Sequence, residues 1–286
     1  MDELEEFLRS RSVGDLLPWP AQHAAAIRFE LSPAEIEEAA LALGLLPSRY
    51  QRNRECISLP SQLTLRRSRV AVIGCGGLGG YVIEELARLG VGTLVAIDPD
   101  FFQEHNLNRQ ILSTQKSLGL AKVAVAAARV AEINPAVNVI AIPAAYTPEG
   151  AAEMLAGVAV VVDALDAIPI RLALARDCCT LGLPLVHGAI AGWYGQVTTQ
   201  FPGDDNLERL YGRSGVAKGI EQQLGNPSFT PAIVASLETA EVCKLLLGAG
   251  TPLRSRNLFI NLLDMSFEEV AFETQARASS PWTSSS

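Results

Sequence analysis

The segment Val70–Gly80, with the sequence VAVIGCGGLGG, decides how the rest of the chain is interpreted. Its short apolar, β-branched start is typical of a buried parallel strand, and the glycines that follow end that strand. The chain resumes as a helical pattern at Tyr81–Leu89 and as a second apolar strand at Thr93–Ile97, which leads into Asp98 and Asp100. We therefore predict a strand, a glycine turn, a helix and a second strand.

This order of elements predicts a nucleotide-binding site. Glycines let the backbone approach a phosphate group, and a helix N-terminus offers free N–H groups and the positive end of its dipole. An acidic residue at the end of the second strand can accept hydrogen bonds from a ribose. Gly74, Gly76, Gly77, Gly79 and Asp98 are thus candidate nucleotide-binding residues. The pattern by itself fits NAD as well as ATP.

Length and composition argue against several classes of protein. A chain of 286 residues that is 49% hydrophobic and 19% charged can bury a large core. The net charge of −8 and the lack of a basic run argue against nucleic acid as a partner. No apolar stretch reaches the roughly 18 residues of a membrane span, and the acidic start does not match a signal peptide. We expect a cytoplasmic protein that binds neither nucleic acid nor a membrane.

For the first 48 residues we predict an N-terminal extension of two or three helices. Ser32–Glu35 is a capping box with proline at the first helical position. Ser48–Arg54 follows as a short basic cluster, for which a solvated surface is the simplest interpretation.

Two polar segments follow apolar strands, where α/β proteins bind ligands. Phe101–Gln110 comes after the second strand, and a helix is predicted next at Leu118–Glu132. Lys122 near the start of that helix either extends into solvent or meets an anion, because a cation normally favours a helix C-terminus. The strand Val158–Val162 leads into the second segment, which carries a pair of carboxylates.

These carboxylates, Asp163 and Asp166, suit a hard cation such as Mg²⁺. Alternatively, one of them caps the next helix, Ile168–Leu181. We expect a supporting role for Asp163 and metal binding for Asp166.

The last third of the chain predicts antiparallel strands and one more long helix. Pro184–Ile190 starts a hairpin, and Pro202–Phe229 is polar without clear periodicity, so it is either a functional loop or disordered. A helix follows at Ala232–Leu247 and a β region at Asn257–Phe272, and residues 276–286 are predicted to be disordered. The fold class is α/β, with a Rossmann-like, mainly parallel sheet that continues into antiparallel strands.

Together these features resemble the ThiF/MoeB/HesA family of ubiquitin-activating-enzyme-like adenylyltransferases. The resemblance covers residues 49–272. It rests on Arg49-Tyr50-Gln51-Arg52, Gly74–Gly79, Ile97–Asp100, Asn106–Gln110, Ala121–Val123, Asp163–Asp166 and Gly188 with Gln196-Val197. A hydride-transferring dehydrogenase has no need of an Asn-Leu-x-Arg-Gln motif after its second strand.

The resemblance implies a function and a set of site residues. The family uses ATP and Mg²⁺ to adenylate the C-terminal glycine carboxylate of a small ubiquitin-like sulfur-carrier protein ending in Gly-Gly, and it works as a homodimer in molybdopterin or thiamine biosynthesis. The residues that match its nucleotide site are Gly74, Gly76, Gly77, Gly79, Asp98, Asp100, Asn106, Asn108, Arg109, Gln110, Lys122 and Asp166. Arg52, Arg109, Lys122 and Asp166 match catalytic positions, with Mg²⁺ on Asp166 and Arg52 reaching the triphosphate of the other subunit. Residues 49–275 would form the adenylation domain.

The chain also departs from the family pattern. It has five cysteines but no Cys-x-x-Cys pair, so we predict no zinc site. Residues 202–230 contain no cysteine, which favours adenylation alone, with sulfur delivered by another protein. Ala167 replaces an asparagine that commonly follows the metal-binding aspartate, so one nucleotide contact is missing.

Two rival functions remain open. An NAD(P)-dependent oxidoreductase would need a catalytic acid or base, and the three histidines, His23, His105 and His187, have no evident partner in the sequence. A non-catalytic scaffold that only binds the carrier would not need the matched phosphate and metal ligands.

Overall fold

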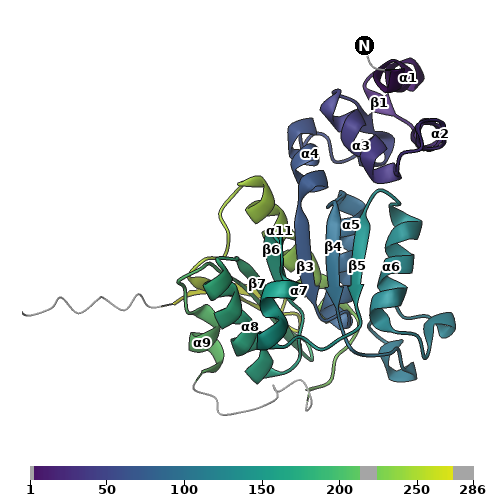
Figure 1. The fold of residues 1–286 in the computed structure, drawn as a ribbon. Coiled ribbons are helices and arrows are strands. Elements are labelled where there is room, and N and C mark those ends of the chain that lie inside the picture. Colours follow the sequence, from purple (N-terminus) through teal and green to yellow (C-terminus); the bar gives the residue numbers. More distant parts are fainter. Residues whose placement is uncertain (1–2, 213–223, 273–286) are drawn as a thin grey trace, which may run out of the picture.

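The computed structural model describes residues 3–212 and 224–272 and is built on one large sheet (Figure 1). Eight strands lie in the order β10-β9-β8-β7-β6-β3-β4-β5. They are β3 (Arg69–Ile73), β4 (Thr93–Ile97), β5 (Asn138–Ile142), β6 (Val160–Asp163), β7 (Leu185–Ala191), β8 (Tyr194–Gln200), β9 (Arg256–Asn261) and β10 (Ser266–Ala271). Neighbours from β5 to β7 pair in parallel, and those from β7 to β10 are antiparallel. The predicted fold class is confirmed.

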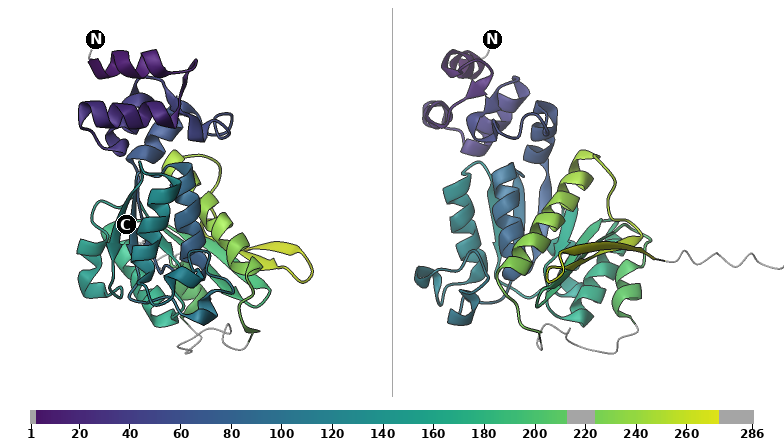
Figure 2. Two further views of the ribbon diagram at one scale, coloured as in Figure 1. Left: turned by 90° about the vertical axis from the view of Figure 1, so that its right-hand side faces the viewer. Right: turned by 180° about the vertical axis from the view of Figure 1, so that it is seen from behind.

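Helices cover both faces of this sheet, and others lie beyond its upper edge in Figure 1. The helices of the described residues are α1 (Glu3–Arg11), α2 (Trp19–Phe29), α3 (Pro33–Ala42), α4 (Leu59–Arg67), α5 (Gly77–Leu89), α6 (Lys122–Ile133), α7 (Ala151–Met154), α8 (Ile168–Leu181), α9 (Asn206–Tyr211) and α11 (Phe229–Leu247). Short 3₁₀ turns are η1 (Ser48–Tyr50), η2 (Glu104–Asn106), η3 (Gln115–Ser117) and η4 (Pro148–Gly150). Figure 1 looks onto α7, α8 and α9, and the right-hand view of Figure 2 looks onto α5, α6 and α11. None of the helices in the described residues could cross a membrane.

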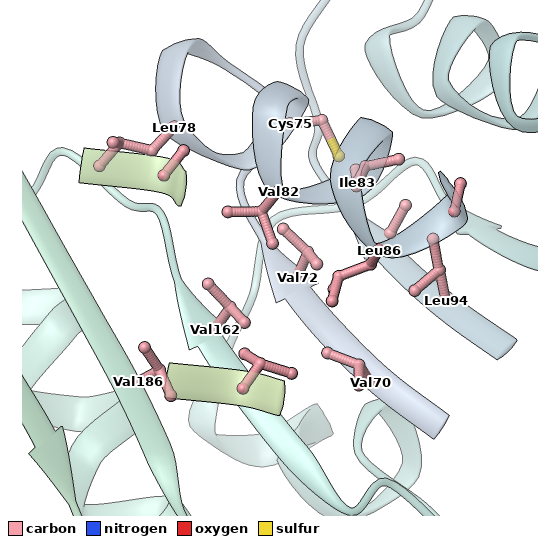
Figure 3. Packing of buried hydrophobic residues seen from close by; sticks show 14 of the residues in the cluster. Val70, Val72, Cys75, Leu78, Val82, Ile83, Leu86, Leu94, Val162 and Val186 are labelled. Atoms are coloured by element: carbon pink, nitrogen blue, oxygen red, sulfur yellow. The ribbon is translucent and has the colours of Figure 1, made fainter. Parts of the chain in front are cut away.

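Strand β3 lies in the middle of the sheet, and its side chains alternate between the two helical layers. Val70 and Val72 belong to the cluster that packs under α5, and Ala71 and Ile73 belong to the cluster on the other face. Figure 3 shows Val70 and Val72 beside residues of α5, among them Val82. Because the strand is buried on both faces, its sequence is continuously apolar. This packing fixes the start of the glycine turn.

Two predicted helix boundaries are wrong by a few residues. Helix α5 begins at Gly77, inside the glycine motif, and not at Tyr81. Helix α6 begins at Lys122 and not at Leu118, because Ala121 forms a β-bridge with Phe101 that holds the preceding chain extended. Both helices therefore begin near strand ends, since Gly77 follows β3 by four residues and the N–H of Lys122 donates to the carbonyl of Asp100 at 2.9 Å. The predicted loop at 202–229 is also wrong in part, since it contains α9.

The N-terminal extension has three helices, as predicted, and a core of its own. Two short strands, β1 (Leu16–Leu17) and β2 (Leu46–Pro47), pair in parallel within it and were not predicted. Its buried cluster comprises Leu8, Leu17, Ala25, Ile36, Ala40 and Leu45. A second cluster with Leu41 and Tyr50 crosses the expected boundary at residue 48, which stays a prediction. The predicted disordered tail, 276–286, lies outside the described residues.

The extension packs on the amino ends of the strands, the upper edge of the sheet in Figure 1. Tyr50 is fully buried at this junction. Its hydroxyl donates to Glu37 Oε1 at 2.9 Å and accepts from Asn134 Nδ2 at 2.7 Å. Arg49 donates to Asn134 Oδ1 and stacks over the ring of Trp19. The basic cluster is thus partly structural, because two of its residues join the extension to the sheet.

Candidate functional site

A cavity of about 670 Å³ lies at the carboxyl ends of β3, β4 and β6. Strand order reverses between β3 and β6, so the cavity is at a topological switch point, where α/β proteins bind ligands. Its wall continues onto the antiparallel strands through Ala189, Gln196 and Phe259. Of the residues expected from the sequence to form the site, Gly74, Gly76, Gly77, Asp98, Asp100, Arg109, Gln110, Lys122 and Asp166 line it.

Gly74 and Gly79 build the turn. Gly74 has a φ of +99°, and a Cβ placed on it would lie 2.6 Å from the carbonyl oxygen of Ala164. A Cβ on Gly79 would lie 1.8 Å from the carbonyl oxygen of Gly74. Since real Cβ atoms do not approach oxygen this closely, both positions require glycine for the local backbone itself.

Gly76 and Gly77 have a different role, because they leave space beside the cavity. The nearest atom to a Cβ on Gly76 would be Gln110 Nε2 at 3.5 Å, and on Gly77 it would be Pro231 Cβ at 3.6 Å. Gln110 Oε1 is buried and accepts no hydrogen bond within the described parts of the chain. An open backbone cradle with an unused acceptor beside it fits a bound polar ligand such as a nucleotide.

The two aspartates after β4 are tied to the glycine turn and to α6. Asp98 Oδ2 accepts from the backbone N–H of Cys75 at 2.7 Å, and Asp98 Oδ1 accepts from that of Asp100 at 2.8 Å. Lys122 Nζ lies 2.8 Å from Asp100 Oδ2 and 3.9 Å from Asp98 Oδ2. The Lys122 side chain is only 8% exposed, so the alternative in which it extends into solvent is wrong.

The segment after Asp100 places Arg109 in the cavity, and its asparagines are engaged in hydrogen bonds within the protein. Arg109 donates to Asn108 Oδ1 at 2.8 Å, and burial lowers the pKa of Arg109 without removing its charge. Asn108 in turn donates to the carbonyl of Asn226. Asn106 Oδ1 accepts from the backbone of Gln103, and Asn106 lines a smaller adjoining cavity of about 230 Å³.

The carboxylates after β6 differ sharply in environment. Asp163 is fully buried, where its Oδ1 accepts from the N–H of Leu165 at 3.1 Å and its Oδ2 lies 2.8 Å from His187 Nδ1. These bonds give Asp163 a structural place in the fold, and its supporting role for a metal on Asp166 stays a prediction. Asp166 is exposed to the cavity, and no hydrogen bond or ion pair engages it in residues 3–212 and 224–272.

His187 therefore has a partner that the sequence did not reveal. Asp163 and His187 are 24 residues apart, but they are register partners on the parallel strands β6 and β7. Tyr211 was also missed. It lines the cavity from α9, and its hydroxyl lies 2.9 Å from His187 Nε2. The only trace in the sequence is the spacing of Leu207, Leu210 and Tyr211, which is too short to predict a helix.

Arg52 is not brought to this cavity. It is exposed in the turn after η1, at the amino edge of the sheet. The neighbouring Tyr50 touches the C-terminal end of α5, under Gly90, whereas the cavity lies at the N-terminal end of α5. A helix of 13 residues is about 20 Å long, so Arg52 and the cavity are separated by a distance of this order.

Comparisons with known proteins agree with this geometry. Residues 50–281 match the model of the ThiF family. The chain is 37% identical over 230 residues to the SAMP-activating enzyme E1 of Haloferax volcanii, covering 79% of this chain and 85% of that protein. It is 35% identical over 229 residues to the sulfur carrier protein adenylyltransferase of Thermus thermophilus, covering 76% and 83%.

Solved structures share the fold. The tRNA N6-threonylcarbamoyladenosine dehydratase TcdA of E. coli matches with a TM-score of 0.60 and 26% identity, over 70% of this chain and 95% of that one. E. coli MccB with MccA-N7isoASN matches with a TM-score of 0.67 and 19% identity, over 80% and 73%. The family match spans most of the chain and includes every element that lines the cavity, and we conclude that this chain belongs to the ThiF family.

Proposed function

We propose that this protein is an ATP-dependent adenylyltransferase that activates the C-terminal glycine carboxylate of a small ubiquitin-like sulfur-carrier protein as an acyl-adenylate and releases pyrophosphate. The observation that carries the proposal is the convergence of the open glycine turn, Arg109, Lys122 and Asp166 on one cavity. The named adenylyltransferases among its relatives support the same reaction. Because the reaction consumes ATP, we propose the cytoplasm as its compartment.

The chemistry needs stabilisation of negative charge more than proton transfer. The glycine carboxylate is already ionised at neutral pH and attacks the α-phosphate, while charge builds up on the departing pyrophosphate. Arg109 and Lys122 supply fixed positive charge in a partly buried site. The attraction between this charge and the phosphates is stronger there than in water, because the effective dielectric constant is lower. Lys122 now pairs with Asp100, so it would exchange that carboxylate for a phosphate oxygen when ATP binds.

The carboxylates present fit one Mg²⁺ ion carried in with the nucleotide. Asp163 is committed to Leu165 and His187, which leaves Asp166 as the free carboxylate after β6. Mg²⁺ is commonly held by one or two carboxylates together with substrate phosphates and water, so a full set of protein ligands is not required. When bound, the ion would offset phosphate charge during transfer. In the described part of the chain no three His, Cys, Asp or Glu residues group to hold a metal ion by themselves.

We further propose a homodimer in which Arg52 acts on the ATP of the other subunit. Its distance from the cavity of its own chain supports this arrangement, because Arg52 could meet a triphosphate only from a second copy.

The test is ATP–pyrophosphate exchange with purified sulfur-carrier proteins that end in Gly-Gly. We expect exchange that depends on one carrier, and an Arg109→Ala variant that folds but loses at least about 100-fold in rate, as for removal of one charge-stabilising group. Binding of ATP and carrier without exchange would contradict the proposal and favour a non-catalytic scaffold.

A further inference from the structure

A chain of hydrogen bonds holds the two peptide groups that flank Leu165, one residue before Asp166. Asp163 Oδ1 accepts from the N–H of Leu165 at 3.1 Å, and the guanidinium of Arg171 donates to its carbonyl oxygen. Asp163 Oδ2 is bonded to His187 Nδ1 at 2.8 Å. The backbone that leads into Asp166 is therefore restrained on both sides.

Tyr211 closes this chain into a ring. Its hydroxyl lies 2.9 Å from His187 Nε2 and 3.3 Å from Arg171 Nη1, and it also accepts from Gln196. We call Asp163, Leu165, Arg171, Tyr211 and His187 the Leu165 ring. Its members come from the end of β6 and from β7, α8 and α9, so they meet only in the complete fold.

Burial and charge give the ring one arrangement of protons. Burial lowers the pKa of His187 against the opposing effect of Asp163, so the imidazole is neutral. Burial alone would raise the pKa of Asp163, but Arg171 and His187 outweigh it and keep the pKa low, so the carboxylate is charged. A neutral histidine that donates from Nδ1 must accept at Nε2, so Tyr211 donates there and accepts from Arg171 and Gln196. A network with a single arrangement holds its members rigidly.

We propose that the Leu165 ring positions Asp166, and that Tyr211 and His187 are positioning residues of the adenylation site. Asp166 has no side-chain partner within the described residues, so its backbone alone aims its carboxylate. A small rotation of the preceding peptide would displace that carboxylate, and groups that bind ions must be held within a fraction of an ångström. The inference rests on the proposed function, because it concerns Asp166 as the ligand of nucleotide-bound metal.

The decisive variant is Tyr211→Phe, which removes the hydroxyl and keeps the aromatic ring that packs edge-on against His187 at 5.5 Å. With a non-hydrolysable ATP analogue present, Mn²⁺ binding measured by electron paramagnetic resonance should weaken by about 10–100-fold, as for loss of groups that orient a metal ligand. Pyrophosphate exchange should then need correspondingly more Mg²⁺. Each Mn²⁺ affinity is compared with the affinity of the same variant for the analogue without metal, which separates loss of the metal ligand from a change in nucleotide contacts.

Tyr50→Phe is the matched control. The Tyr50 hydroxyl bonds to Glu37 Oε1 at 2.9 Å and to Asn134 Nδ2 at 2.7 Å at the opposite edge of the sheet, so the variant loses comparable bonds outside the ring and away from the cavity. Its Mn²⁺ affinity should equal that of the wild type. If Tyr211→Phe does not fold, Gln196→Leu, which removes one bond to the Tyr211 hydroxyl, takes its place with the same expectation.

Wild-type Mn²⁺ affinity in a folded Tyr211→Phe or substitute Gln196→Leu variant would overturn the inference, as would an equal loss in Tyr50→Phe. If the proposed function itself were wrong, a different result would be seen. Wild-type protein would then show no carrier-dependent exchange, while the comparison of Mn²⁺ affinities would still decide whether the ring positions Asp166.

Discussion

At the scale of single residues, one glycine motif serves two separate purposes. Gly74 and Gly79 allow backbone approaches that no side chain could tolerate, whereas Gly76 and Gly77 leave room beside the cavity. The spacing of glycines in the sequence predicts the motif but does not tell these purposes apart, because the distinction depends on which atoms of the folded chain face each Cα.

Alanine substitutions should separate the two purposes. Gly79→Ala should lower the free energy of unfolding by several kcal/mol, because its Cβ would overlap the carbonyl of Gly74. Gly77→Ala should unfold at nearly the wild-type temperature but bind ATP at least about 10-fold more weakly, because its methyl group takes up space in the cradle. Thermal unfolding and ATP titration measure the two effects. A normally stable Gly79→Ala variant would refute the structural role.

Glu238 should make the fold less stable as pH rises. Its carboxyl group is fully buried against Gly188, and burial, followed by repulsion from Asp163, raises the pKa of Glu238 well above its ordinary value. The folded state therefore keeps a proton that the unfolded state releases. The stability this provides is complete below about pH 4.5 and is lost, by up to about 1.4 kcal/mol per pH unit, as pH rises toward the folded-state pKa.

Glu238→Gln tests this directly. The difference in unfolding temperature, variant minus wild type, should increase as pH rises from 5, since glutamine does not titrate. The exposed Glu268→Gln serves as control and should show no such trend. Parallel curves for Glu238→Gln and wild type would show that Glu238 does not titrate in this range.

At the scale of elements, the sequence predicts long helices and strands with a clear apolar period. It does not predict short elements or contacts that depend on residues far away in the sequence. The strand at Thr93–Ile97 and the helix at Ile168–Leu181 are where the sequence predicts them. Helix α9 has only six residues, and its position depends on packing of Leu207 in the core. The pairing of Asp163 with His187 depends on strand register, which the sequence of either strand alone does not specify.

The junction of the extension with the sheet should depend on one hydroxyl group. Tyr50→Phe leaves the buried Glu37 without its donor and should cost about 1–3 kcal/mol of unfolding free energy. Differential scanning calorimetry should show a lower unfolding temperature, while ATP affinity stays at the wild-type value. Tyr81→Phe, a half-buried tyrosine of α5, is the control. Equal stability of both variants would mean that the extension is held by its apolar contacts alone.

At the scale of the whole molecule, the expected site is almost complete in one chain. Arg109, Lys122 and Asp166 reach one cavity from different loops because the ends of parallel strands meet at one edge of the sheet. Arg52 is the exception, at the opposite edge. The sequence pattern that matches Arg52 to a catalytic position carries no information on which subunit it serves, and that assignment stays a prediction.

Mixed dimers provide the test for Arg52. Arg52→Ala and Asp166→Ala dimers should each lose adenylation. A heterodimer of the two variants, purified with two different affinity tags, should regain about half the wild-type exchange rate, because one of its two sites keeps both residues. Absence of rescue in a verified heterodimer would mean that Arg52 acts within its own chain or not on ATP.

The extension and the cavity lie at opposite edges of the sheet, and this polarity affects how binding can be measured. Figure 1 shows α1 above the upper edge of the sheet, whereas the cavity lies at the carboxyl ends of the strands. A chain attached to a sensor surface near α1 would therefore present its cavity to the solution. An anchor near β10 would instead stand next to β9, whose Phe259 forms part of the cavity wall. Association rates for nucleotide and carrier should therefore be taken from molecules tethered at the amino edge, where the tether is far from either ligand.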